Sequence, residues 1–83
     1  MKYIYGIEVH EYAAYKNKWV WMDVGNIEST HCEDDAMDAA PELSTDGLEP
    51  GSYRLYVKSH NGQGDIDVIW EKHFERKTLT VWA

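Results

Sequence analysis

The segment from Glu28 to Leu43 is the only part of the chain whose sequence favours an α-helix, and it limits what the chain can fold into. Thr30 can serve as the N-cap of a capping box, because an acid follows it three residues later. Pro41 has no amide hydrogen and clashes with the preceding turn, so we expect the helix to end at Ala39 or Ala40. The chain therefore has one short helix with which to cover everything else.

Helical spacing divides this segment into a small apolar side and an acidic side. The apolar side is Cys32, Ala36, Ala39, Ala40 and, if the helix extends so far, Leu43. The acidic side is Asp34, Asp35, Asp38 and, if the helix extends so far, Glu42. Because Cys32 falls on the apolar side, we expect a buried thiol rather than a nucleophile.

The rest of the chain alternates between apolar and polar residues, which is the pattern of β-strands. We predict strands over residues 2–12, 18–24 (ended by Gly25-Asn26), 52–58 and 65–70, a turn near residues 71–73 or 75–77, and a last strand through Leu79, Val81 and Trp82. Short connections favour antiparallel pairing. The predicted fold is α+β: a single domain over residues 1–83 in the order ββαβββ, an antiparallel sheet with one short helix on one face.

One short helix cannot cover five strands, so part of the other face should be exposed or should bind something. We expect some of the sheet aromatics there, facing solvent or a second copy: Tyr3, Tyr5, Trp19, Trp21, Tyr53, Tyr56 and Trp70. Ile66, Val68 and Trp70 are expected to share one face of their strand, since they alternate with other residues.

Charge is distributed unevenly along the chain. Between Trp19 and Tyr53 there are nine acidic residues and no Lys or Arg, while the remainder carries all 8 basic residues. The net charge of −7 therefore arises in the middle of the sequence. Such a segment repels nucleic acid and attracts basic surfaces, although a soluble helix can also carry acids simply because its outer side meets water.

No motif for covalent catalysis is present, and we expect no catalytic residues and no enzyme activity. His31 and Cys32, with Asp34, Asp35 and His10 as further candidates, have the ligand types of a metal site, but their spacing matches no zinc pattern. Asp65 and Asp67 place two carboxylates close together, a pattern better explained by an exposed strand face. We therefore predict no resident metal and no cofactor.

The remaining composition indicates the cellular compartment in which we expect the protein. The single cysteine permits no internal disulfide, and no apolar run approaches the length of a membrane span. No signal-peptide core follows Met1-Lys2. We expect a cytoplasmic protein, and no direct contact with a membrane or with nucleic acid.

Two stretches carry a family resemblance. They are Thr30-His31-Cys32-Glu33-Asp34-Asp35-Ala36, which opens the helix, and Leu48-Glu49-Pro50-Gly51-Ser52-Tyr53, which enters a strand. With the small size and the acidic centre, the chain resembles small bacteriophage-encoded inhibitors of host machinery, the class that includes anti-CRISPR and other anti-defence proteins. The resemblance implies non-catalytic blocking of a nucleic-acid-handling complex in the cytoplasm of the host cell.

A rigid array of carboxylates can present charge as a phosphate backbone does, and so occupy a groove lined by Lys and Arg. The residues expected to bind such a basic partner first are Asp34, Asp35, Asp38 and Glu42, with Glu28, Glu33, Asp46 and Glu49 as the rim. Two alternatives remain open: an assembly protein that forms homodimers or larger species through its aromatic sheet face, and a small metal-binding protein.

Overall fold

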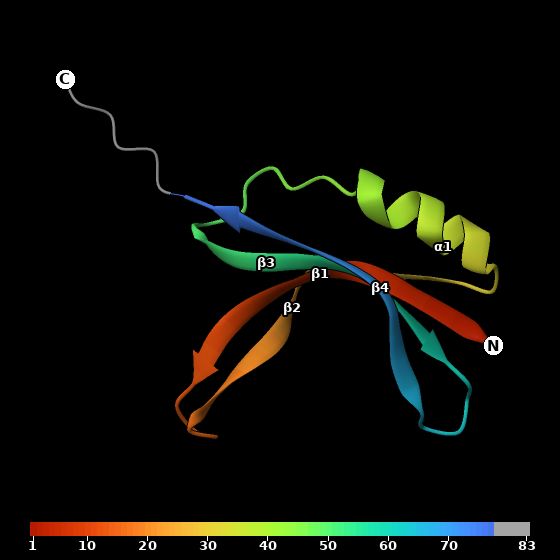
Figure 1. Ribbon diagram of the computed structural model, residues 1–83, viewed down its shortest axis with the longest axis horizontal. Helices are drawn as coiled ribbons and strands as arrows, with labels where there is room; N and C mark the ends of the chain where they lie inside the picture. Colours follow the sequence, from red (N-terminus) through yellow and green to blue (C-terminus); the bar gives the residue numbers. More distant parts are fainter. Residues whose placement is uncertain (78–83) are drawn as a thin grey trace.

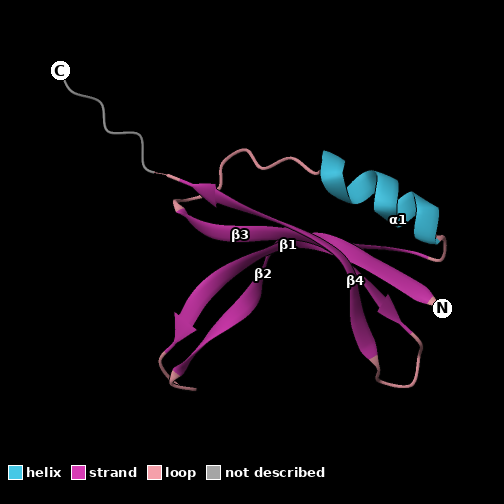
Figure 2. Ribbon diagram, viewed as in Figure 1, coloured by secondary structure: helices cyan, strands magenta, loops and turns pink. Residues whose placement is uncertain are grey.

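The computed structural model describes residues 1–77, the side chain of Asn26 excepted. Its elements are β1 (Lys2–Ala13), β2 (Lys18–Thr30), α1 (Glu33–Ala39), a 3₁₀ turn η1 (Ala40–Glu42), β3 (Gly51–His60) and β4 (Ile66–Arg76). The strands form one antiparallel sheet in the order β2-β1-β3-β4. α1 lies over one face of this sheet, and the far ends of the two hairpins bend away from it (Figures 1 and 2).

The α+β class, the antiparallel sheet and the single short α-helix are confirmed within the described residues. The predicted ββαβββ order is not matched, because these residues give ββαββ. The predicted last strand through Leu79, Val81 and Trp82 lies outside the described residues. Of the two positions predicted for a turn, residues 71–73 are wrong: β4 continues to Arg76, which pairs with Gly51, because β3 offers a partner along the whole length. The other position, residues 75–77, overlaps the end of β4.

The second strand was predicted to end at Gly25-Asn26, and this is wrong. Gly25 has a φ of +79°, and the register shifts opposite Gly6, so the chain forms a bulge there. Beyond the bulge the strand pairs again, with Glu28 opposite Tyr5. A glycine that marks a bulge and a glycine that ends a strand look alike in the sequence.

The helix begins later than the capping box predicted. Thr30 still pairs with Tyr3 in the sheet, so the chain turns into the helix only after it, with Cys32 at the N-cap and no side-chain cap. Thr30 Oγ1 instead accepts the Cys32 N–H at 3.2 Å. The expected buried thiol is therefore wrong: Cys32 precedes the helix and is exposed. The predicted end at Ala39 or Ala40 is confirmed, with Pro41 inside η1.

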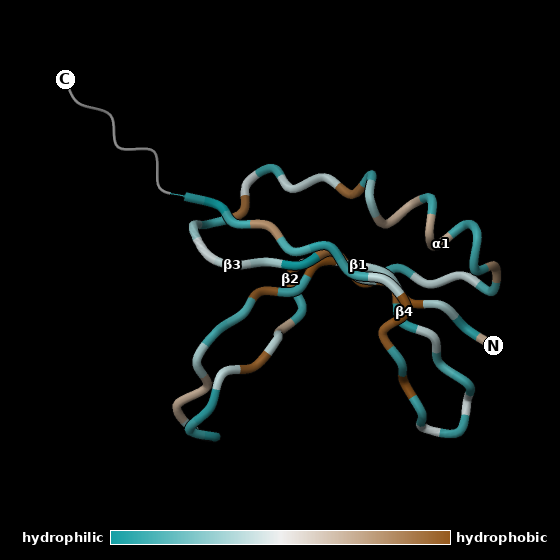
Figure 3. Tube along the Cα trace, viewed as in Figure 1, coloured by the Kyte–Doolittle hydropathy of each residue, from teal (hydrophilic) through white to brown (hydrophobic). Residues whose placement is uncertain are grey.

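The core lies on the face of the sheet that α1 covers. One cluster joins Ala36 and Ala40 to Val57, and a second joins Ile7, Tyr53 and Leu55. Hydrophobic and hydrophilic residues alternate both along the strands and along α1 (Figure 3). The alanines face the sheet, as the helical spacing predicted, and this leaves the acidic side of α1 outward.

A second bulge changes which residues of β4 face the core. Trp70 pairs with Val57, but Val68 pairs with Lys58, so Ile69 is the extra residue. Trp70 consequently packs against both core clusters on the helix side, while Val68 lies on the opposite face. The expectation that Ile66, Val68 and Trp70 share one face is wrong, because the extra residue reverses the alternation.

Gly6 provides a test of the packing on the sheet face opposite the helix, where it pairs with Tyr56. A Cβ at Gly6 would lie 3.0 Å from the hydroxyl oxygen of Tyr56, which is only 1% exposed. Gly6→Ala should therefore lower the free energy of unfolding by about 1–3 kcal/mol, through overpacking. Urea denaturation measures this change. At Gly51 a Cβ would make an ordinary 3.5 Å contact with the Tyr53 ring, so Gly51→Ala is the control and should change stability by less than about 1 kcal/mol. Equal effects of the two substitutions would contradict the close approach at Gly6.

Candidate protein-binding surface

The four acids expected to bind first lie on one continuous helical segment. Asp34, Asp35 and Asp38 belong to α1, and Glu42 belongs to η1, which follows without a break. All four are exposed, while Ala36 and Ala40 of the same segment are fully buried. The structure thus brings these four carboxylates together on the outer side of the helix.

The four rim residues are also exposed, but they come from three different elements. Glu33 opens α1, Glu28 lies on β2, and Asp46 and Glu49 lie in the loop between η1 and β3. Glu28 pairs with Tyr5 and so lies on the helix side of the sheet. We call the eight residues together the acidic surface: Glu28, Glu33, Asp34, Asp35, Asp38, Glu42, Asp46 and Glu49.

None of the acidic surface is neutralised by an ion pair within the described residues. The salt bridges there involve only two carboxylates, Glu8 and Glu71. Glu8 pairs with Arg54 at 2.6 Å and with Lys58 at 2.9 Å, on the sheet face opposite the helix. Lys72 lies on the helix side of the edge strand β4 and makes no salt bridge with the acidic surface.

The sheet face opposite the helix, which we call the open face, carries a row of aromatic rings in contact with one another. His10 stacks on Trp21, with 4.7 Å between the ring centroids. The Arg54 guanidinium lies over the same Trp21 ring, 4.5 Å from its centroid. Trp19 continues the row 5.2 Å from His10 and is 62% exposed. The expectation of solvent-facing sheet aromatics is therefore confirmed for Trp19.

Five other aromatic residues expected to face solvent are instead packed on the helix side or buried. Tyr3, Tyr5, Tyr53 and Trp70 pack in the clusters on the helix side. Tyr56 lies on the open face but is buried, and its hydroxyl donates to Asp23 at 2.7 Å. Burial first, and then the bond to Asp23, raise the pKa of Tyr56 well above its usual range. Tyr56 therefore remains a neutral donor at any physiological pH.

The metal-binding alternative gains no support. Cys32 is exposed, and His31 Nδ1 lies 3.3 Å from the Met1 carbonyl oxygen. Within residues 1–77 no three His, Cys, Asp or Glu side chains are grouped so that they could hold a metal ion. In the same part of the chain no helix is long and apolar enough to cross a membrane.

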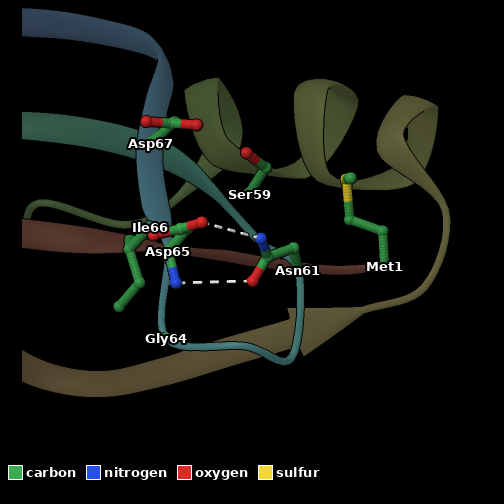
Figure 4. Close-up of a pocket in the computed structure, with 7 residues that line it drawn as sticks. All are labelled: Met1, Ser59, Asn61, Gly64, Asp65, Ile66 and Asp67. Atoms are coloured by element: carbon green, nitrogen blue, oxygen red, sulfur yellow. Dashed lines mark hydrogen bonds between the residues drawn. The ribbon is translucent and has the colours of Figure 1, made fainter.

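Figure 4 shows the region of Asp65 and Asp67, beside a polar cavity of about 580 Å³ at the β3–β4 loop. Asp65 precedes β4 and is held by Asn61: its carboxylate accepts the Asn61 amide at 3.1 Å, and its N–H donates back to the Asn61 side chain at 3.3 Å. Asp67 lies apart from it on the strand (Figure 4). The loop is thus closed by its own side chains.

Sequence reasoning missed the pairing of Glu8 with Arg54 and Lys58, and a pocket that joins Glu28 to Asp46. Glu8 and Arg54 are directly opposite in the sheet, but they are 46 residues apart in the chain. Only the register of β1 against β3 reveals the pair, and a single sequence does not specify that register.

Comparison with known proteins gives no match to a family model, to a curated protein or to a solved structure. The functional argument therefore depends on the geometry and the charges of these surfaces.

The Glu71–His73 contact on the open face predicts a pH effect. A hydrogen bond from His73, 3.1 Å away, is the main cause that holds the pKa of the Glu71 carboxyl below its ordinary value of 4.5. His73→Ala should raise this pKa toward 4.5. Since a lowered pKa gives stability that is present above the ordinary value and lost as pH falls through the folded value, the variant should lose less stability on acidification below about 4.5.

Carboxyl ¹³C NMR titration measures the pKa of Glu71 directly. His31→Ala is the matched control, because His31 is exposed and its hydrogen-bond partner is the Met1 carbonyl, not Glu71. An unchanged Glu71 titration in His73→Ala, or an equal shift in His31→Ala, would show that His73 does not act on this carboxyl.

Proposed function

We propose that this protein binds a basic surface of another protein or ribonucleoprotein through its acidic surface, and so blocks a nucleic-acid-handling complex without catalysis. The observation that supports this is the gathering of eight exposed carboxylates on the helix side, none of them in a salt bridge within residues 1–77. The resemblance to phage-encoded anti-defence inhibitors makes host CRISPR effector complexes and nucleases the first targets to examine. Such targets place its action in the host cytoplasm.

The spacing of the helical acids supports mimicry of a nucleic acid strand. Five carboxylates, Glu33, Asp34, Asp35, Asp38 and Glu42, are distributed over ten consecutive residues. At about 1.5 Å of rise per residue this segment is about 14 Å long, or about one charge per 3 Å. A DNA strand carries about one charge per 3.4 Å of helix axis. A groove lined by Lys and Arg would meet a similar charge density on either ligand.

Neutralising the first four acids tests the proposal. The variant Asp34→Asn, Asp35→Asn, Asp38→Asn and Glu42→Gln should lose inhibition of DNA binding by the target complex, because the partner's cations lose their counter-charges. Inhibition by the unmodified protein should weaken as salt is raised, since the Debye length is only about 10 Å at 0.1 M. Mobility-shift assays with a panel of purified CRISPR effector complexes and nucleases measure both effects.

The matched control removes the same charge elsewhere: Glu11→Gln, Asp65→Asn, Asp67→Asn and Glu75→Gln, all exposed and outside the acidic surface. Circular dichroism checks that both variants fold, because loss of acids from the first helical turn removes about 0.3–1 kcal/mol of dipole stabilisation each. Full inhibition by the helix variant, equal loss in the control, or no inhibition of any complex would contradict the proposal.

A second candidate is self-assembly through the open face, and the exposure of its aromatics favours it. Trp19 is 62% exposed and Tyr12 is 49% exposed, and the two rings meet edge to face at the end of the row. A contiguous patch of exposed apolar side chains often marks an interface, and these two rings adjoin one another. On this alternative the occupant of the open face is a second copy of the chain.

Sedimentation velocity at increasing protein concentration tests self-assembly. A dimer formed through the open face should weaken at least about tenfold in Trp19→Ala, because a large aromatic contact is a common hot spot. Tyr15→Ala is the control, since Tyr15 is 79% exposed in the β1–β2 turn. A monomer at every concentration, or association that is unchanged in Trp19→Ala, would exclude this arrangement.

A further inference from the structure

A pocket of about 340 Å³ lies on the helix side of the sheet, between β2 and the loop that follows η1. Its lining is apolar except at the Ser44 hydroxyl, which accepts the Asp46 N–H at 3.4 Å, and at two carboxylates. The residues are Ile7, Val24, Gly25, Glu28, Leu43, Ser44, Asp46 and Leu48. Its volume is at the lower end of the range for ligand sites, which suits one long side chain better than a larger molecule.

The fold builds the apolar part of this pocket from the core. Leu43 and Leu48 anchor the two ends of the loop on the cluster that contains Ile7, and Val24 pairs with Ile7 from β2. The bulge at Gly25 follows directly, and a Cβ there would meet no atom within 4 Å. The pocket is therefore open beside Gly25, while the rest of its apolar lining is continuous with the second core cluster.

The polar part of the pocket is negative. Glu28 comes from β2 and Asp46 from the loop, and both are exposed and make no salt bridge within residues 1–77. Two carboxylates oppose the entry of an anion. An uncharged apolar ligand would fill the lining but would leave both carboxylates partly desolvated without a partner. A cation on an aliphatic stem satisfies both parts of the site.

We propose that this pocket receives a lysine or arginine side chain of the basic partner. The aliphatic stem lies against Ile7, Val24 and the two leucines, and the charged head lies between Glu28 and Asp46. This inference rests on the proposed function, because it names the feature of the basic partner that the acidic surface recognises. It adds a shape requirement: one cation must project far enough to enter the pocket.

NMR titration with three small amides tests the pocket without the partner. The probes are Nα-acetyl-arginine amide, Nα-acetyl-lysine amide and the uncharged Nα-acetyl-norleucine amide. At least one cationic probe should shift the Gly25 amide and the Leu43 and Leu48 methyl signals in a saturable manner, with a Kd on the order of 1 mM for a ligand of this size. The norleucine probe should bind at least about tenfold more weakly, and the stronger cationic probe identifies the preferred head group.

Two double variants of equal charge separate the pocket from the general negative field. Glu28→Gln with Asp46→Asn should weaken the cationic probe at least about tenfold, whereas Glu33→Gln with Asp34→Asn, on α1, should change its Kd less than about twofold. Equal binding of norleucine amide, equal loss in both variants, or shifts confined to α1 would overturn the inference.

The inhibition assay distinguishes failure of this inference from failure of the proposed function. If the helix variant abolishes inhibition but the cationic probes do not bind the pocket, only the inference fails. If the probes bind as expected but the protein blocks none of the complexes, the pocket stands as a cation site and the proposed function fails.

Discussion

The placement of Glu8 at the centre of the sheet is the constraint on which the rest of the structure depends. Its carboxylate is almost completely buried, yet it lies on the face that has no helix over it. Arg54 and Lys58 cover it from β3, and Tyr56 beside them donates to Asp23. Loss of one partner from such a buried pair typically costs about 3–5 kcal/mol. These five side chains from three strands therefore do on the open face what a second layer does in larger domains.

This arrangement also determines where the free charge lies. Arg54 and Lys58 are committed to Glu8 on the open face, and Arg54 also binds Glu71 there. The carboxylates of α1 consequently have no salt bridge to these cations across the sheet. The sheet thus separates an internally balanced face from an unbalanced one. A surface left unbalanced on one side of a thin molecule gives a directed field, which can orient an incoming basic partner.

Sequence reasoning succeeded where the signal is local. Alternation located all four described strands, and Pro41 located the end of α1, because both depend on neighbouring residues. It failed where an extra residue is accommodated by pairing with a distant strand. The bulge at Gly25 lets β2 continue beyond its predicted end. The extra residue Ile69 reverses the alternation in β4, so that Trp70 and Val68 lie on opposite faces.

The candidate binding surface also has one part that the sequence predicts and one part that it does not. The carboxylates of α1 could be predicted because helical spacing alone sets their side, and the burial of Ala36 fixes it. The pocket could not be predicted, because Glu28 and Asp46 line one pocket only when β2 continues past Gly25 and the loop after η1 packs near Ile7. The thiol of Cys32 is misplaced for a related reason: the helix starts two residues later than predicted, with the N-cap at Cys32 instead of Thr30, so Cys32 lies outside the helical pattern.

The pocket matters because carboxylates in water discriminate poorly. An exposed ion pair contributes only about 0.2–1 kcal/mol, so the row on α1 can accelerate association with many basic surfaces without selecting among them. Selection requires a contact that only some partners can make. A cation drawn over Ile7 and the adjoining leucines is partly removed from water, and there its attraction to Glu28 and Asp46 is less screened. A partner whose cations lie flat on its surface would gain the field but not this contact. The acidic surface would then determine how fast partners arrive, and the pocket would determine which of them remain.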